Sequence, residues 1–430
     1  MNFEFSEAFA QELDEKDKLK KFREEFIFPD LGKGEKIVYL CGNSLGLQPK
    51  RVKEYIQQEL DDWGKFAVEG HFHAKRPWFS YHELLSPQLA KLTGALETEV
   101  VCMNQLTVNL HLLMASFYQP TKEKFKIICE AKAFPSDRYA LLSQIRFHGF
   151  DPKDALIEIA PNEGEYLTDE QKYLDAIEQH KDQLAMVMIG GVNYFTGQVF
   201  DMEKISKATK KTGAMMGVDL AHAIGNVALN LHDWEIDFAT WCSYKYLNSS
   251  PGGVSGVFVH EKHHKNKAIK RFEGWWGHSK ERRFLMEPEF IPIESAEAWQ
   301  LSNAPILIMA AHLASLSLFE EAGFENLIEK RKMLSDYLFF IVDEINKTLK
   351  SEEIDNELTI ITPKEHDRKG AQISIVVKND GRKLFDEISK NGIIADWREP
   401  NVIRIAPAPL YNNFSDVYEF AQLMLKSLKS

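Results

Sequence analysis

The chain has 430 residues, enough for two or three domains and a large buried core. Hydrophobic residues make up 44% and charged residues 27%, values close to the globular average that exclude a disordered or fibrous chain. The 52 Lys and Arg against 64 Asp and Glu give a net charge of −12, which argues against nucleic acid or an anionic membrane as the main partner.

Cysteine usage and the N-terminus favour a cytoplasmic location. The four cysteines lie in apolar stretches without a Cys-x-x-Cys pair, so they predict reduced core thiols and no metal site. Residues 1–21 contain no apolar segment of the kind that a signal peptide needs. No stretch approaches the roughly 20 apolar residues of a membrane span, so we expect no membrane partner.

The first ninety residues predict helices and loops. Phenylalanines and leucines at helical spacing predict an amphipathic helix over 3–25. A strand-like run at 37–40 leads into a turn-rich loop at 42–47, and a helix is expected over 49–66. Residues 70–78 gather histidines and aromatics in an expected loop, which could contact a ligand or be ordinary polar surface.

From residue 100 onward, β-branched runs alternate with helical patterns. Strands are expected at 100–103, 125–129, 184–192, 215–218, 238–242 and 254–260. Thr107 can cap the helix that follows the first strand, and Ser136 opens the helix after the second. Strands separated by helices predict a mostly parallel sheet with right-handed crossovers, hence an α/β domain.

Beyond residue 305 the pattern predicts a smaller α+β domain. Long helices are expected at 306–322 and 327–349, strands at 358–361, 372–377 and 402–405, and shorter helices near 383–390 and from 415. The expected division is an N-terminal helical segment with active-site loops at 1–90, a large α/β domain at 91–305 and a small α+β domain at 306–430.

Polar and aromatic residues follow the carboxyl ends of the expected strands, where open α/β sheets bind ligands. They are Leu106, Thr107, Phe134, Ser136, Asp137, Asp219, His222, Tyr244 and Lys245. Lys245 lies between two tyrosines, directly after an apolar run and ahead of a glycine turn. This edge therefore combines an amine, an imidazole, two carboxylates, an aromatic face and hydroxyls at helix starts.

These groups suit pyridoxal phosphate. The cofactor requires an amine for covalent attachment, a carboxylate for its ring nitrogen, an aromatic cover and a phosphate site at a helix start. Lys245 meets the first requirement, Asp219 the second and Phe134 the third. Thr107, with Ser136 or Tyr244, meets the last.

Most of these residues, taken singly, have simpler explanations. A lysine beside a strand is usually a surface residue whose stem covers apolar area. Asp137 could cap its helix, and His222 could be a core histidine with satisfied hydrogen bonds. The pairing of Asp219 with Lys245 on consecutive strands favours the cofactor over these alternatives.

Seven segments in order resemble kynureninases, a family of fold-type-I enzymes of the aspartate aminotransferase superfamily. They are GNSLGLQP at 42–49, FPSD at 134–137, DLAHA at 219–223, WCSYKYLN at 241–248, GWWGH at 274–278, LSNAP at 301–305 and NVIRIAP at 401–407. The resemblance covers nearly the whole chain, from about 37 to 412. It implies a three-layer α/β/α large domain with a mostly parallel sheet and a smaller α+β C-terminal domain.

The resemblance also implies a reaction and its cofactor. Enzymes of this family use pyridoxal phosphate to hydrolyse L-kynurenine, or 3-hydroxy-L-kynurenine, to an anthranilate and L-alanine in tryptophan catabolism or NAD biosynthesis. By resemblance, Lys245 binds the cofactor and moves the Cα proton, Tyr244 donates a proton, and Asp219 holds the ring nitrogen. His222 lies beside Asp219, and Phe134 stacks on the ring.

Further site residues follow from the same resemblance. Leu106, Thr107 and Asp137 complete the cofactor pocket, Ser44 and His71 line the aryl pocket, and Arg404 binds the substrate carboxylate. Family members are homodimers, and Trp275 and Asn303 would reach the cofactor phosphate and the substrate from the neighbouring chain. Some relatives carry a serine or threonine where this chain has Gly190, so no role is assigned to that position.

Three alternatives are weaker. A cysteine desulfurase needs a catalytic cysteine near the small domain, and no cysteine follows Cys242. A non-catalytic binding protein on this fold should have lost Lys245 or Asp219, and both are present. Nucleotide binding lacks a glycine-rich phosphate loop after the first strand.

Overall fold

The computed structural model describes residues 2–30 and 37–429, and these form two compact units. The small unit comprises 1–51, 194–199 and 317–430, and the large unit comprises 52–193 and 200–316. The domain boundaries expected near 90 and between 305 and 325 stay predictions. Helix α1 (Glu7–Lys16) packs on α13 (Phe414–Leu428), which joins the N-terminal segment to the C-terminal one.

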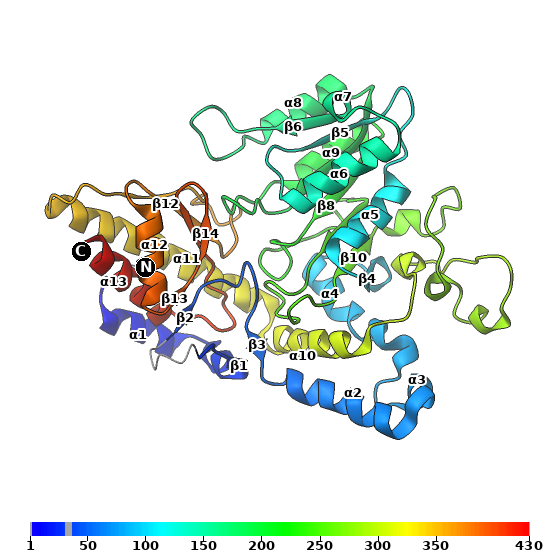
Figure 1. The fold of residues 1–430 in the computed structure, drawn as a ribbon, viewed down its shortest axis with the longest axis horizontal. Coiled ribbons are helices and arrows are strands. Elements are labelled where there is room, and N and C mark those ends of the chain that lie inside the picture. Colours follow the sequence, from blue (N-terminus) through cyan, green and yellow to red (C-terminus); the bar gives the residue numbers. More distant parts are fainter. Residues whose placement is uncertain (1, 31–36, 430) are drawn as a thin grey trace. The chain divides into compact units, whose positions relative to one another are not determined.

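The large unit is built on a seven-stranded sheet (Figure 1). In spatial order its strands are β4 (Val100–Cys102), β10 (Gly256–Val259), β9 (Phe238–Trp241), β8 (Met215–Asp219), β7 (Leu184–Gly190), β5 (Lys126–Glu130) and β6 (Leu156–Ile159). Five neighbouring strands are parallel, and β10 runs antiparallel to both its neighbours. The expected mostly parallel sheet is confirmed.

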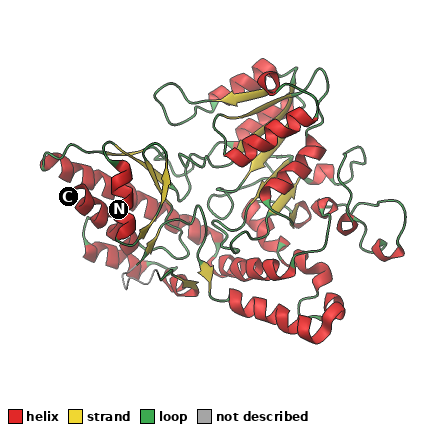
Figure 2. Ribbon diagram, viewed as in Figure 1, coloured by secondary structure: helices red, strands yellow, loops and turns green. Residues whose placement is uncertain are grey.

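Helices alternate with these strands (Figure 2). They include α5 (Leu106–Phe117), α6 (Pro135–Phe147), α8 (Gln171–His180) and α9 (Met202–Lys211). All residues of the central strands β5 and β9 are buried, as expected of strands covered on both faces. In the core, Phe117 of α5 stacks on Phe238 of β9 with ring centroids 5.0 Å apart. Strand β6 and helix α8 had no counterpart among the sequence-based elements.

Further helices belong wholly or mainly to the large unit, and the last of them continues past its boundary at residue 316. They are α2 (Val52–Phe66), α3 (Gly70–His73), α4 (Ser86–Thr93), α7 (Pro152–Ala155) and α10 (Ile306–Ala322). Val52 packs on Ala311 and Ala314, so α2 and α10 lie side by side (Figure 1). The loop expected over 70–78 was wrong in part, because its first four residues form α3.

The small unit has an antiparallel sheet of its own. Its order is β11 (Leu358–Ile360), β12 (Ile373–Val377), β15 (Val402–Ile405) and β14 (Asp396–Arg398). Shorter strands are β1 (Phe26–Ile27), β2 (Val38–Tyr39), β3 (Gln48–Pro49) and β13 (Ile393–Ile394). The expected α+β character is confirmed for this part of the chain.

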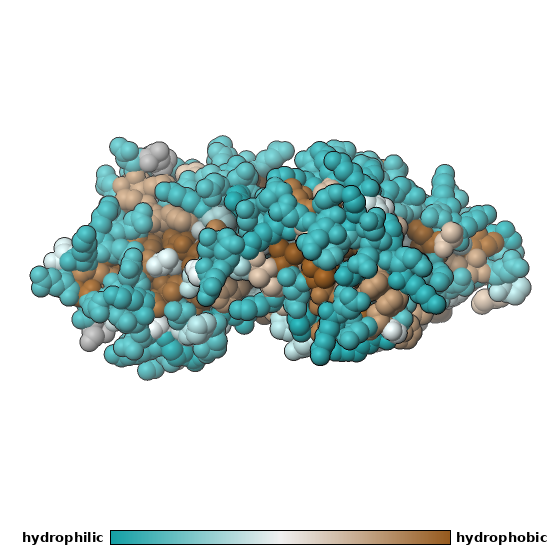
Figure 3. All heavy atoms as spheres, turned by 90° about the horizontal axis from the view of Figure 1, so that it is seen from above, coloured by the Kyte–Doolittle hydropathy of each residue, from teal (hydrophilic) through white to brown (hydrophobic). Residues whose placement is uncertain are grey.

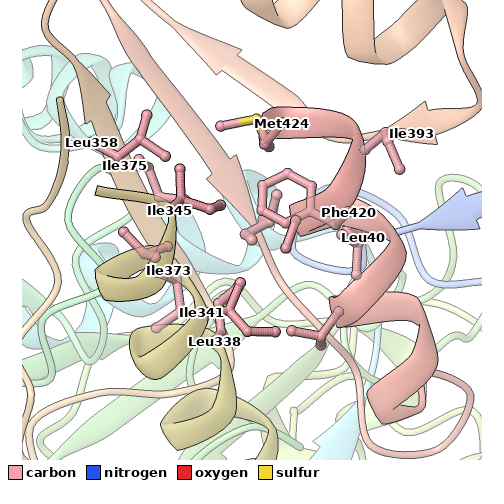
Figure 4. Packing of buried hydrophobic residues seen from close by; sticks show 14 of the residues in the cluster. Leu40, Leu338, Ile341, Ile345, Leu358, Ile373, Ile375, Ile393, Phe420 and Met424 are labelled. Atoms are coloured by element: carbon pink, nitrogen blue, oxygen red, sulfur yellow. The ribbon is translucent and has the colours of Figure 1, made fainter. Parts of the chain in front are cut away.

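Helices α11 (Phe324–Ser351), α12 (Gly381–Lys390) and α13 close the small unit. Figure 4 shows their core, in which Ile341 and Ile345 of α11 face Phe420 of α13. The single helix expected over 3–25 is broken, because Asp17 after α1 has extended backbone and a 3₁₀ turn follows at Lys20–Glu25. Among the described residues, no single helix is both long and apolar enough to cross a membrane, although the bent pair of α10 and α11 reaches that length together.

Candidate active site

Three neighbouring strands of the large unit end in residues of chemical interest. β5 ends at Glu130, β7 at Gly190 and β8 at Asp219. The next strand, β9, ends at Trp241, and Lys245 follows four residues later. Parallel strands share a carboxyl edge, so the sheet gathers these positions at one edge, as the sequence predicted for Asp219 and Lys245.

Lys245 is a buried amine with a defined partner. Only 9% of the residue is exposed, and its Nζ lies 3.0 Å from Nε2 of His222. A lysine ammonium can only donate, so the His222 nitrogen accepts. The same Nζ lies 5.7 Å from the centroid of the Phe134 ring, which is 40% exposed. The simpler explanation, a wet surface lysine, does not apply.

Two buried carboxyl groups, Asp137 and Asp219, lie next to each other in the site. Asp137 is buried in the first turn of α6, and burial together with the neighbouring Asp219 raises its pKa well above the usual value. Asp219 accepts a hydrogen bond of 2.7 Å from the Ala221 N–H through its Oδ1. A protonated ring nitrogen is the kind of group that such a carboxyl pair lacks, so these residues fit pyridoxal phosphate.

Tyr244 adjoins the same group of residues, with its ring centroid 6.0 Å from Nζ of Lys245. It packs against a small cluster of Leu106, Ala221 and Cys242. Burial, with smaller effects from Cys242 and Asp219, raises the pKa of Tyr244 above its usual value. The phenol therefore keeps its proton near neutral pH, as a proton donor must.

The two predicted hydroxyl caps were wrong. Thr107 is the second residue of α5, whose N-cap is Gln105, and Ser136 is the second residue of α6, whose N-cap is Phe134. Neither helix start has a side-chain cap, so no capping side chain accepts from the backbone N–H groups in the first turn of either helix. Such N–H groups, with a hydroxyl in the same turn, are typical of phosphate sites. Asp137 does not cap α6 either, because it pairs with Asp219.

A second group of polar residues belongs to the small unit. Arg404 on β15 is 1% exposed and donates to the Tyr194 carbonyl and to Asp396 on β14. The Ser44 hydroxyl donates to the same Asp396 oxygen across 2.7 Å, and Arg398 donates to it across 3.0 Å. Asp396 thus links Arg404 with Ser44, two residues that the sequence predicted for different ends of the substrate.

Three predicted residues lie elsewhere in the large unit. His71 on α3 has its Nδ1 2.9 Å from the Val68 carbonyl. Trp275 is 44% exposed, and its Nε1 donates to the Arg283 carbonyl across 3.2 Å. Asn303 is exposed. No described contact joins these three residues to the group around Lys245.

Sequence reasoning missed two carboxylates. Glu130 was overlooked because the expected strand stopped one residue short of it, and a Glu after an apolar run was a usable signal. Asp396 lies on a strand of three residues, which is too short to produce a hydrophobic alternation.

The sequence has close relatives along its full length. It is 53% identical to a kynureninase of Christiangramia forsetii over 430 residues, all of both chains, and 50% identical to one of Myxococcus xanthus over 98% of this chain and 97% of the relative. Residues 327–424 match the family model described as the kynureninase C-terminal domain.

Solved structures agree on the fold. A cysteine desulfurase of Thermococcus onnurineus superposes with a TM-score of 0.73 at 17% identity, covering 91% of this chain and 95% of that one. A cysteine desulfurase of Escherichia coli superposes with a TM-score of 0.74 at 14% identity, covering 96% and 98%. These likenesses show the fold-type-I architecture, whereas identity near one half over the whole length shows that the chain belongs to the kynureninase family of pyridoxal-phosphate-dependent hydrolases.

Proposed function

We propose that this chain hydrolyses L-kynurenine, 3-hydroxy-L-kynurenine or both, giving an anthranilate and L-alanine. Full-length similarity to kynureninases supports the reaction. The observation that carries the site is the buried amine of Lys245 on the sheet edge that also holds Asp219. Such a reaction serves tryptophan catabolism or NAD biosynthesis.

The cofactor is held by residues of the large unit. Lys245 would hold pyridoxal phosphate through its amine, Asp219 would pair with the ring nitrogen, and Phe134 would cover the ring. His222 and Asp137 support the amine and the carboxylate, as their contacts in the structure indicate. The starts of α5 and α6, with Leu106, Thr107 and Ser136, hold the phosphate end.

Proton transfers are the work of two side chains. When bound, the cofactor supplies an electron sink that makes the substrate Cα acidic. Lys245 takes the Cα proton and returns it in a later step of the reaction. Water adds to the aryl ketone, the Cβ–Cγ bond breaks, and Tyr244 donates a proton to the three-carbon fragment that leaves as alanine. Its packing beside Leu106, Ala221 and Cys242 places Tyr244 among the residues proposed to surround the cofactor.

Substrate recognition falls to other residues. Arg404 binds the substrate carboxylate, because a guanidinium can hold both oxygens in one plane. Ser44 and His71 contact the aryl ring. Asp396, which fixes the Arg404 guanidinium through a charged hydrogen bond, is a positioning residue in this scheme.

The working protein is a homodimer in which each chain completes the other's site. An exposed apolar surface formed by Trp275, Phe284, Leu285 and Met286 supports this, since each of these side chains is at least 44% exposed. Trp275 and Phe284 pack edge to face with ring centroids 5.6 Å apart. Hydrophobic areas also interrupt the hydrophilic surface in Figure 3. Patches of this kind mark protein interfaces, and Asn303 would act from the partner chain.

The four cysteines are free thiols, which supports a reducing, cytoplasmic setting.

The decisive experiment offers both kynurenines to the purified protein reconstituted with pyridoxal phosphate. Release of the fluorescent anthranilate is expected from at least one of them, with the Lys245→Ala variant as the inactive control. L-cysteine serves as a second control, from which no sulfide should form. Absence of turnover with both kynurenines would remove the substrate assignment.

A further inference from the structure

Two carboxyl groups flank a glycine at the edge of the large sheet. Glu130, Gly190 and Asp219 are the last residues of β5, β7 and β8, and β7 lies between the other two strands. Neighbouring strands lie about 4.8 Å apart, so Glu130 and Asp219 start two strand spacings from each other. Because residue 190 has no side chain, that position places nothing between them.

The Glu130 carboxyl fills the space that a side chain at position 190 would take. A Cβ built on Gly190 would lie 2.9 Å from Oε1 of Glu130, closer than real Cβ atoms come. The other oxygen, Oε2, accepts a 2.8 Å hydrogen bond from the Asn193 side chain, and the Gly190 N–H donates to the carboxyl as well. Two donors therefore hold this group in place.

The groups that face Glu130 bring no compensating charge. They are Asp219 from β8, Asp137 from α6, Tyr173 from α8 and Cys129 from its own strand. Burial raises the pKa values of the Tyr173 phenol and the Cys129 thiol, so both are neutral near pH 7. Among the described residues, no cationic side chain lowers the pKa of Glu130.

We propose that Glu130 is a positioning residue that acts through Asp219, its charge reaching across Gly190 to strengthen the pairing of Asp219 with the protonated ring nitrogen of pyridoxal phosphate. The inference rests on the proposed role of Asp219. A negative charge near a cationic ring favours the protonated ring, and in a buried site the effect is weakly screened.

The pH dependence follows from the state of Glu130. Burial raises its pKa to about 7, the Asn193 amide opposes that rise, and the charge of Asp219 adds to it. Glu130 is therefore mainly protonated at pH 6 and mainly ionised at pH 8. By linkage, binding the cationic ring favours the ionised form, so cofactor uptake below pH 7 releases a proton from Glu130.

The test measures the Kd of pyridoxal phosphate for the full-length apoprotein at pH 6 and pH 8. We compare the wild type with Glu130→Gln, which keeps the shape and removes the charge. Ionisations of the cofactor and of Lys245 are common to both, so they cancel in the comparison. The wild type should gain roughly tenfold in affinity relative to Glu130→Gln between pH 6 and pH 8. Glu158→Gln, at an exposed ion pair on β6, is the matched control and should follow the wild type.

A second variant keeps the test valid if Glu130→Gln does not fold. Asn193→Leu removes a donor that stabilises the ionised carboxyl, so the rise in affinity should move to higher pH while the carboxylate remains. If Glu130→Gln and Asn193→Leu both keep the wild-type pH profile, the proposal is overturned. Asp219→Asn tests the role of Asp219 separately. Unchanged affinity for pyridoxal phosphate in that variant would remove the role of Asp219 itself. Weakened affinity in that variant, together with a wild-type pH profile in Glu130→Gln, would remove only the role proposed for Glu130.

Discussion

Lys245 and His222 form a hydrogen-bonded pair, with 3.0 Å between Nζ and Nε2. The imidazole nitrogen lies within hydrogen-bond distance of the amine, so it gives this buried group a polar partner. An amine that must alternately bind a carbonyl carbon and carry a proton benefits from a partner that tolerates both states. The pair therefore gives the buried lysine a polar partner that suits the anchor and base roles proposed for it.

Replacing the anchor should remove the colour of the enzyme. Lys245→Ala cannot bind pyridoxal phosphate covalently, so the purified variant should lack the visible absorbance of the wild type after gel filtration. The measurement is an absorbance spectrum at matched protein concentration. His222→Asn should retain the colour, because the amine remains. Undiminished colour in Lys245→Ala would show that another group holds the cofactor.

The Asp137 and Asp219 pair predicts different outcomes for two substitutions at one position. Asp137 carries a proton when Asp219 is ionised, because burial and that neighbouring charge raise its pKa. Asp137→Asn can still donate to Asp219, so cofactor affinity should stay within about threefold of the wild type. Asp137→Ala leaves Asp219 without the donor and should weaken affinity about tenfold or more. Equal effects of the two variants in a binding titration would contradict a shared proton.

Arg404 and Asp396 should affect substrate binding more than the cofactor. Arg404→Lys loses the planar two-point grip on a carboxylate and should raise KM for kynurenine about tenfold or more, with the Kd of pyridoxal phosphate unchanged. Asp396→Asn should shift KM in the same direction by less, since Ser44 still has an acceptor there. Steady-state kinetics and a cofactor titration together distinguish this outcome from general damage.

A shared active site predicts complementation between two inactive variants. In a mixed dimer of Lys245→Ala and Asn303→Ala chains, one of the two sites combines an intact lysine with an intact asparagine. Equal mixing after dissociation and reassociation should restore about a quarter of the wild-type activity, because half the dimers are mixed and each has one good site. Activity that stays at the level of the separate variants would place Asn303 within its own chain's site, or outside the site.

The ionisation of Glu130 should make the free energy of unfolding of the apoprotein fall as the pH rises. Burial raises its folded-state pKa to about 7, above the ordinary value of 4.5, so the folded state binds the proton more tightly than the unfolded state. The folded apoprotein therefore loses stability as pH rises from 4.5 to 7, by at most about 3 kcal/mol. Glu130→Gln removes this loss, so its Tm relative to the wild type should be higher at pH 8 than at pH 5. Thermal unfolding at the two pH values provides the measurement.

Much of this architecture could be predicted from the residues. Apolar runs marked the strands that end near Asp219 and Lys245, because strands covered on both faces need such runs. The strand at 156–159 was missed because Glu158 interrupts its apolar pattern and pairs with Arg138. Cap signals at Thr107 and Ser136 misled because both residues lie two positions past the N-caps of their helices.

A site residue could be predicted where its residue type is rare at that position in the sequence. It could not be predicted where its role depends on neighbours in space. A lysine at a strand end stood out in the sequence. The relation between Glu130 and Asp219 did not, because it arises from a sheet order in which β7 separates β5 from β8. Asp396 likewise gains its meaning from Arg404, its partner across β14 and β15.

Because β10 runs antiparallel to β9, the loop that contains Lys245 begins and ends at one edge of the sheet. β9 and β10 are antiparallel neighbours, and Trp241 lies opposite Gly256. The segment 242–255 therefore leaves the sheet and returns to it at the same edge, without a helix crossing a face. A Cβ on Gly256 would come within 2.1 Å of the Trp241 ring, so the return point is closely fixed. The amine is therefore carried by a mostly buried loop between two antiparallel neighbours, and the Ser315 hydroxyl of α10 fixes that loop by donating to the Leu247 carbonyl.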